Sequence, residues 1–328
     1  MNLGIVLTRE HRLLSVAAIL DVFETVNRFY KEEGHSPFFT IELVHTGNVE
    51  LTAFSGYVSK SIASIDDYHL LLIPAFKPGP LSQFVANNHY FIPWLRQQYQ
   101  NGATIASFCT GTFLLGASGL LDNRSATTHI DAADVFANTF PKVKLQADAV
   151  ITQDDGLCTS GGATNSFHLM LKLIEIYCGR KLAVRTAKVF SIDLNRQQQG
   201  YFRSFYPPED HGDDLVKLTQ QKIKEQFSKV NTVEEIITDI PSSRRNLVRR
   251  FKHATGITPI EYLQKTRIEA AKELLEQSKQ SILQVMIESG YNDLKNFRSL
   301  FKRNVGMTPK AYREKFNGSH VLPARYMP

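Results

Sequence analysis

The sequence contains few cysteines and no long apolar segment. Its three cysteines, Cys109, Cys158 and Cys178, form neither a CxxC pair nor a disulfide framework. This usage favours a reducing compartment and argues against a structural zinc site. No stretch approaches the roughly 20 apolar residues that a membrane-spanning helix requires, and the N-terminus lacks the pattern of a secretory signal. We therefore expect a cytoplasmic protein with no membrane partner, no bound metal and no other cofactor.

The charged residues are divided unevenly along the chain. A length of 328 residues predicts two domains, because single cores usually stop growing at about 100 to 200 residues. Residues 213–328 carry 21 Lys and Arg against 13 Asp and Glu, whereas residues 1–212 carry 17 against 19. A basic C-terminal part is typical of nucleic-acid binding, and a solvated basic surface is the alternative explanation.

The first two hundred residues alternate strand-like apolar runs with amphipathic helical runs. This alternation predicts an α/β fold in which helices cover both faces of a parallel sheet. The turn residues Asp154-Asp155-Gly156 predict a hairpin between 149–152 and 157–159, and a long apolar helix should follow Gly161-Gly162. The remaining expected strands are 3–7, 39–44, 70–73 and 104–108, and the remaining expected helices are 13–29 and 92–99.

A change of composition marks the expected domain boundary. The stretch GYFRSFYPPEDHG, 200–212, combines paired prolines with glycines and acidic residues, so it can continue neither a helix nor a central strand. We assign 1–200 to the first domain, 201–212 to a linker, 213–318 to an all-α second domain and 319–328 to a tail. The helices expected in the second domain are 215–227, 233–237, 243–253, 259–277, 282–288, 293–303 and 309–316.

Two C-terminal segments repeat each other. The sequence LVRRFKHATGITPIEYLQ reappears fifty residues later as FRSLFKRNVGMTPKAYRE, which indicates a supersecondary module that is used twice. Phe251 coincides with Phe301, and we expect both rings to anchor the core. Gly256 coincides with Gly306, and both positions suit the glycine that ends a helix.

Each repeat contains a short helix, a turn and a second helix, which predicts a helix-turn-helix unit. In the second unit, Gly290 should supply the positive φ of the turn, and Asn292 should cap the next helix. In the first unit, Pro241 breaks the chain, and either Ser242 or Ser243 caps. The paired helices are 233–237 with 243–253, and 282–288 with 293–303.

The second helix of such a unit reads base edges with its N-terminal turns, and Arg and Asn suit bidentate contacts with guanine and adenine. A helical bundle with basic surfaces is the alternative explanation. The predicted base-reading positions and caps are Ser243, Arg244, Arg245, Asn246 and Arg249 in the first unit, and Asn292, Leu294, Lys295 and Arg298 in the second. The predicted phosphate contacts are Arg250, Lys252, Lys302, Arg303 and Lys310.

Residues 213–316 resemble the AraC/XylS class of DNA-binding domains. The resemblance rests on RRFKHATGITPIEYLQKTRIEAAKELL and IESGYNDLKNFRSLFKRNVGMTPKAYREKF. It implies seven helices with two helix-turn-helix units joined by a long helix, 259–277. The family commonly has Arg where this chain has Ser299, while Arg298 precedes it, so the second unit departs from the pattern. We expect double-stranded DNA as a partner, with a homodimer and RNA polymerase as further partners.

The run TIASFCTGTFLLGASGLLDNRSATTH predicts a strand, a sharp turn at Cys109 and a helix that begins at Thr110-Gly111. A cysteine on a strained elbow near a helix N-terminus is typical of a nucleophile, because the helix dipole favours the thiolate. A buried cysteine at the end of a strand is the alternative reading, and the local pattern does not choose between them.

Residues 1–200 resemble the ThiJ/PfpI superfamily, which has a flavodoxin-like sheet with a cysteine at such an elbow. The motifs are SFCTGTFLLGASGLLDNRSATTH and TSGGATNSFHLMLKLIE, and the domain order is similar to that of GlxA-type regulators. Enzymatic relatives place a carboxylate where this chain has Ser15, and the nearest acid, Asp21, falls on the opposite helical face. The chain also has Ala75 near the usual oxyanion-hole glycines and His168 where relatives often have Asp. These departures favour binding over catalysis, so no catalytic residue is assigned.

The combined patterns predict a transcription regulator whose first domain senses a small-molecule effector. His129 is a pocket candidate, although a lone histidine is more often a structural hydrogen bonder. Alternatives are a cysteine-dependent hydrolase or hydratase fused to a DNA-binding domain, a redox sensor that uses Cys109, and a DNA-binding scaffold without an effector. The residues expected to line the effector pocket are Ser15, Ala75, Cys109, Thr110, His129 and Gly162.

Overall fold

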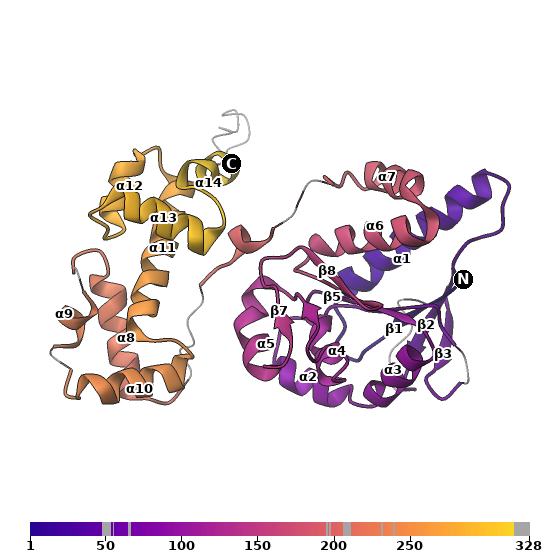
Figure 1. Ribbon diagram of the computed structural model, residues 1–328, viewed down its shortest axis with the longest axis horizontal. Coiled ribbons are helices and arrows are strands. Elements are labelled where there is room, and N and C mark those ends of the chain that lie inside the picture. The colour runs from indigo at the N-terminus through magenta and orange to yellow at the C-terminus, as the bar shows by residue number, and fades with distance from the viewer. Residues whose placement is uncertain are drawn as a thin grey trace, which may run out of the picture. The chain divides into compact units, whose positions relative to one another are not determined.

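The computed structural model divides into two compact units, Met1–Gly200 and Tyr201–Pro328 (Figure 1). The predicted tail, 319–328, and residues 206–210 of the predicted linker lie outside the described part of the chain. No helix among the described residues is long and apolar enough to cross a membrane. The structure describes residues 1–47, 54, 56–64, 67–194, 196, 198–205, 211–230, 232–238 and 240–317.

A seven-stranded sheet forms the centre of the first unit, in the order β3-β2-β1-β4-β5-β9-β8. All neighbouring strands are parallel except β8 and β9, which form the predicted hairpin. β6 and β7 form a separate small sheet. The strands are β1 (Asn2–Val6), β2 (Thr40–His45), β3 (Val58–Ser61), β4 (Leu70–Ile73), β5 (Thr104–Phe108), β6 (Ser125–Ala126), β7 (Lys144–Leu145), β8 (Ile151–Asp154) and β9 (Leu157–Ser160).

Helices cover both faces of this sheet, so the α/β fold predicted from the sequence is confirmed (Figure 1). One layer packs a core through Phe23 and Leu173, and the other packs a core through Phe91 and Leu114. The first layer contains α1 (Leu13–Glu32), α6 (Asn165–Cys178) and α7 (Arg180–Val189). The second contains α2 (Leu81–Asn87), α3 (Phe91–Gln100), α4 (Thr112–Ala117) and α5 (Ala133–Thr139).

The second unit is helical, as predicted, and it has two cores. The first core joins α8, α9 and α10 to the start of α11 around Phe251 and Tyr262. The second joins the rest of α11 to α12, α13 and α14 around Phe297 and Phe301. The long helix α11 therefore belongs to both helix-turn-helix units. The helices are α8 (Asp214–Gln226), α9 (Val233–Ile237), α10 (Arg244–Thr255), α11 (Pro259–Gln277), α12 (Ile282–Glu288), α13 (Leu294–Val305) and α14 (Pro309–Phe316).

Side chains cap the N-termini of the helices of the second unit. Ser243 caps α10 by accepting a hydrogen bond from Asn246 N at 3.3 Å. The prediction that Asn292 caps α13 is wrong, because Asp293 accepts from Asn296 N at 2.5 Å and Asn292 lies one position too early. The offset of fifty residues matches Asp293 with Ser243, so the repeat itself contained the correct cap. Gly256 and Gly306 end α10 and α13 in the left-handed conformation, as predicted.

Five residues of the predicted linker belong to the second unit and pack against its helices, and we call this segment, Tyr201–Phe205, the strap. The rings of Tyr201 and Phe202 contact Phe316 of α14. Lys272, in the middle of α11, donates a hydrogen bond from Nζ to the carbonyl of Arg203. The ring of Phe205 lies 5.2 Å from that of Tyr262, near the start of α11. The strap therefore follows α11 and touches both cores.

Candidate DNA-binding surface and cysteine elbow

The second helix of the first helix-turn-helix unit, α10, has two distinct faces. Leu247 and Phe251 are buried in the first core. The opposite face forms a shallow depression, and every residue that lines it is basic or apolar. Four predicted DNA-binding residues therefore share one surface. The lining residues are Arg244, Arg245, Val248, Arg249, Lys252 and His253.

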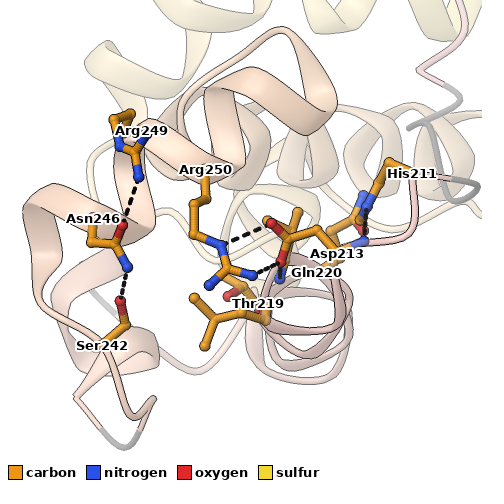
Figure 2. Close-up of polar contacts among 10 residues, drawn as sticks. His211, Asp213, Thr219, Gln220, Ser242, Asn246, Arg249 and Arg250 are labelled. Atoms are coloured by element: carbon orange, nitrogen blue, oxygen red, sulfur yellow. Dashed lines mark hydrogen bonds and ion pairs between the residues drawn. The ribbon is translucent and has the colours of Figure 1, made fainter.

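Hydrogen bonds orient part of this surface. Asn246 donates from Nδ2 to Ser242 Oγ at 3.0 Å, and its Oδ1 accepts from Arg249 at 3.1 Å (Figure 2). Arg244 forms an exposed ion pair with Glu234 of α9, and exposed pairs of this kind contribute little to stability. Arg245 makes no hydrogen bond or ion pair with another described residue. Its guanidinium is thus available for a ligand.

Arg250 lies on the same helix but has a different partner. Its Nε and a terminal nitrogen donate to the two carboxylate oxygens of Asp213 at 2.8 and 2.7 Å (Figure 2). The hydrogen bonds from Arg250 hold the pKa of Asp213 below its ordinary value. The side chain that the sequence assigned to a phosphate is therefore engaged within the protein.

The second helix-turn-helix unit has the same helices and turn as the first, with fewer basic residues on its second helix, α13. Gly290 has φ 82°, and a Cβ there would lie 2.6 Å from the carbonyl oxygen of Phe227, so the turn requires glycine. Leu294 packs partly against the second core. Ser299 occupies the position that Arg249 holds in the first unit. The exposed basic residues of this unit that the sequence predicted are Lys295, Arg298, Lys302, Arg303 and Lys310.

A buried arginine, which sequence reasoning missed, joins the two helix-turn-helix units. Arg267 of α11 donates to the carbonyls of Phe227 and Val230 at 2.8 and 2.5 Å, beyond the end of α8. Its guanidinium also lies 5.6 Å from the ring centre of Tyr291, in the second turn. In the sequence it is one of several charged residues of a long helix. Only the fold shows that it is buried.

The predicted elbow at Cys109 is present in the first unit. Cys109 has φ 54°, a left-handed conformation that costs a residue other than glycine about 1 to 3 kcal/mol. It follows β5 directly and begins a short 3-10 helix, Cys109–Gly111. A Cβ on Gly111 would lie 2.4 Å from the carbonyl oxygen of Pro74, so the elbow is pressed against the end of β4.

The structure brings the predicted pocket residues together at the carboxyl ends of β1, β4, β5 and β9. Ser15 Oγ accepts from Ala75 N at 3.0 Å, and Thr110 Oγ1 accepts from Phe76 N at 3.0 Å. The strand order reverses between β1 and β4, and ligands of open α/β sheets bind at such switch points.

Gly162 and His129 form the other side of this group. A Cβ on Gly162 would lie 2.6 Å from the imidazole of His129, so the two residues are in close contact. His129 Nδ1 accepts from Asp131 N at 3.2 Å and caps a short 3-10 helix. His168 lies apart from them, on α6, where it lines a cavity with Lys172 and Arg180.

The chemistry of the elbow favours a neutral thiol. Burial raises the pKa of Cys109, although backbone N–H groups of Ala163 and Thr110 and the charge of Arg12 oppose the shift. Among the described residues, none of the groups that act on this thiol is a carboxylate. The N–H of Ala75 is already bonded to Ser15 and is not free for an oxyanion. No described group of His, Cys, Asp and Glu could hold a metal ion.

Gln199 is a second residue that sequence reasoning missed. It is 1% exposed, and its Oε1 accepts from Gly162 N at 3.0 Å and from Asn165 Nδ2 at 2.9 Å. Its Nε2 donates to the carbonyls of Thr128 and Ala147 at 2.9 and 2.8 Å. Thr128 in turn donates to the carbonyl of Cys109 at 2.9 Å. Gln199 therefore supports the elbow from the C-terminal end of the first unit.

Comparison with known proteins gives matches for both units. Residues 20–176 match the DJ-1/PfpI family, and residues 239–315 match a helix-turn-helix domain.

Three relatives are transcriptional regulators. CdhR of Pseudomonas aeruginosa is 30% identical, and the match covers 68% of this chain and 66% of that protein. ArgR of the same organism is 27% identical, with 71% of each chain covered. GlxA of Rhizobium meliloti is 26% identical, with 67% of this chain and 68% of that protein covered. The chain thus matches about two thirds of the length of these relatives.

Proposed function

Because the chain belongs to the AraC-type regulators that carry a DJ-1/PfpI domain, we propose that it binds specific double-stranded DNA and responds to a small molecule. The basic face of α10 is the observation that carries this proposal. In two helix-turn-helix units joined by α11, α10 and α13 would enter successive major grooves about 34 Å apart. RNA polymerase and a second copy of the chain are the further expected partners.

The two recognition helices should contribute unequally. On α10, Arg245 and Arg249 present guanidinium groups suited to guanine edges. On α13, the corresponding turns have Lys295 and Arg298, and Ser299 stands where α10 has Arg249. Base reading by α10 would then supply most of the specificity. The proposed phosphate contacts are Lys252 in the first helix-turn-helix unit and Lys302, Arg303 and Lys310 in the second.

Alanine substitution in α10 tests the proposal. Arg245→Ala and Arg249→Ala should each weaken binding to a duplex selected by the wild-type protein by about 1 to 3 kcal/mol and relax base preference at one position. Fluorescence anisotropy with a scrambled duplex as competitor measures both effects. Lys188→Ala, which removes the same charge from an exposed site on α7, serves as the control. Unchanged affinity and base preference in both α10 variants would refute the assignment.

The elbow site is the proposed effector site. It lies at the switch point of the sheet, and the charge of Arg12 acts on both Cys109 and His129. Arg12 makes no side-chain hydrogen bond or ion pair with another described residue, so the site should favour a small anion such as a carboxylate. A thermal-shift screen that compares carboxylates with their neutral amides tests this, because a ligand at 100 times its Kd adds about 2.7 kcal/mol. Arg12→Gln should abolish a shift caused by the carboxylates.

We propose that this site binds without turnover. The Cys109 thiol is buried, its pKa is raised, and the Ala75 amide is occupied. Cys109→Ser should therefore leave DNA binding and its response to the ligand intact. A hydrolytic turnover of the ligand that the wild-type protein shows and Cys109→Ser loses would instead establish the cysteine-dependent enzyme.

A further inference from the structure

The ion pair between Arg250 and Asp213 joins the recognition helix to the helix that starts the second unit. Two guanidinium nitrogens of Arg250 donate to the two carboxylate oxygens of Asp213, and this bidentate geometry is the strongest form of an Arg–carboxylate pair. Asp213 also caps α8 by accepting from Val216 N at 3.2 Å. One carboxylate thus holds the N-terminus of α8 and the middle of α10 (Figure 2).

Arg250 points away from the proposed DNA face. The residues that line that face form three adjacent pairs that repeat every four positions, 244–245, 248–249 and 252–253, and Arg250 is not one of them. Leu247, three residues before Arg250 and therefore next to it on the helix surface, is buried. The side of α10 that carries Arg250 is therefore the side that packs on the rest of the domain.

The segment before Asp213 is fastened to the same place. His211 shares a hydrogen bond with Gln220 of α8 at 2.9 Å, and Asp213 N donates to His211 Nδ1 at 3.3 Å (Figure 2). Gln220 is itself buried. Hydrogen bonds of the preceding segment therefore hold Asp213 in place, so that Arg250 is paired with a carboxylate whose position is fixed.

The repeat shows what this pair replaces. The position fifty residues after Arg250 is Leu300, which packs partly against the second core. The second helix-turn-helix unit thus has an apolar side chain at the position where the first helix-turn-helix unit has a charged one. In the first helix-turn-helix unit, α10 is held by the ion pair of Arg250 with Asp213, and such a directional contact fixes the orientation of the helix as well as its distance from α8.

We propose that Asp213 and Arg250 are positioning residues that orient α10 for base reading, and that Arg250 is not a phosphate contact. The inference rests on the proposed DNA-binding function. Loss of the pair should impair specific binding, which depends on the placement of Arg245 and Arg249, and leave binding to unrelated DNA unchanged.

Two single substitutions separate positioning from phosphate contact. Asp213→Asn keeps a residue that caps helices well and removes the ion pair, and Arg250→Gln removes the other partner. Both should weaken binding to the selected duplex by roughly tenfold and leave affinity for a scrambled duplex unchanged. The dependence of affinity on salt should keep its slope, and the double variant should bind about as well as either single variant.

A phosphate contact predicts the opposite pattern. Arg250→Gln would then weaken binding to both duplexes and lower the salt slope by about one unit, while Asp213→Asn, which removes a negative charge, would leave binding unchanged or tighten it. That outcome would overturn the inference.

Hydrogen exchange of the free protein provides a measurement that does not depend on DNA. Amides of α10 should exchange faster in both variants, while those of α13 stay unchanged. Equal exchange of α10 in the wild type and both variants would contradict the positioning role. If the wild type bound no duplex at all, the proposed function would fail, and this experiment would still decide whether the pair holds α10.

Discussion

Gly111 and Cys109 lie where the backbone of the first unit turns sharply against the end of β4. The elbow brings residue 111 so close to the end of β4 that a methyl group would meet the carbonyl oxygen of Pro74. The sequence showed small residues around the cysteine, and this contact explains why one of them has to be glycine.

Gly111→Ala should therefore destabilise the first unit by about 1 to 3 kcal/mol or more, because its neighbours are backbone atoms that cannot turn aside. Gly56→Ala is the matched control, since a Cβ there meets nothing within 4 Å. Denaturant unfolding followed by the fluorescence of Trp94, the single tryptophan, reports on this unit. Equal losses in the two variants would show that the elbow is not close-packed.

His129 should make the stability of the first unit depend on pH. Burial lowers its pKa, Arg12 adds to the effect, and Asp131 opposes it. The unfolded chain then binds its proton at a higher pH than the folded chain does. The free energy of unfolding should stay level above about pH 6.5 and fall as the pH drops below that value.

His129→Gln should reduce this fall, and His168, whose pKa burial also lowers, should account for part of the remainder. Unfolding by denaturant at about pH 7.5 and pH 5 measures the difference. A wild-type free energy that rises toward pH 5 would have the wrong sign for a histidine whose pKa is lower in the folded chain than in the unfolded chain.

At the scale of helices and strands, local patterns predicted what local forces determine. β4 and β5 have the predicted bounds, because their apolar runs are buried on both faces. The edge strand β3 was missed, since its sequence, VSKS, is polar and only half-buried. The helix α7 was missed for a related reason, because it places several charged residues at the surface.

Contacts between distant residues could not be predicted from such patterns. Gln199 reaches the elbow, and Arg250 reaches Asp213, across 30 or more positions of sequence. Nothing in the neighbouring residues marks either side chain as buried or paired. The candidate pocket residues are a prediction that came from a family resemblance, and the supporting residues around them had no such source.

The corrected cap of α13 gives a test at the scale of one helix. Asp293→Ala should cost about 0.5 to 2 kcal/mol of stability, because it leaves the N–H of Asn296 without its acceptor. Asn292→Ala, one position earlier and exposed, should change the stability by less than about 0.5 kcal/mol. Thermal unfolding followed by circular dichroism compares the two. A larger loss for Asn292→Ala would restore the original assignment.

At the scale of the whole molecule, the two helix-turn-helix units are similar in fold and different in chemistry. The first has the denser basic face and an ion pair behind it, and the second has an apolar contact behind a sparser one. Arg267 and α11 connect them across their shared boundary. Selection of DNA by such a protein should be more sensitive to changes in one half of its site than in the other.

The strap should affect the stability of a fragment that contains only the second unit. A fragment that starts at Asp213, as the family resemblance would indicate, lacks the ring of Tyr201 on Phe316 and the carbonyl of Arg203, which accepts from Lys272 in addition to the carboxylate of Glu269. A fragment that starts at Tyr201 keeps both. The shorter one should be less stable by at least about 2 kcal/mol, which corresponds to a Tm roughly 10 °C lower. A Tm that is the same for both fragments would show that the strap is dispensable. Homology and folding thus place the start of the same module at different residues.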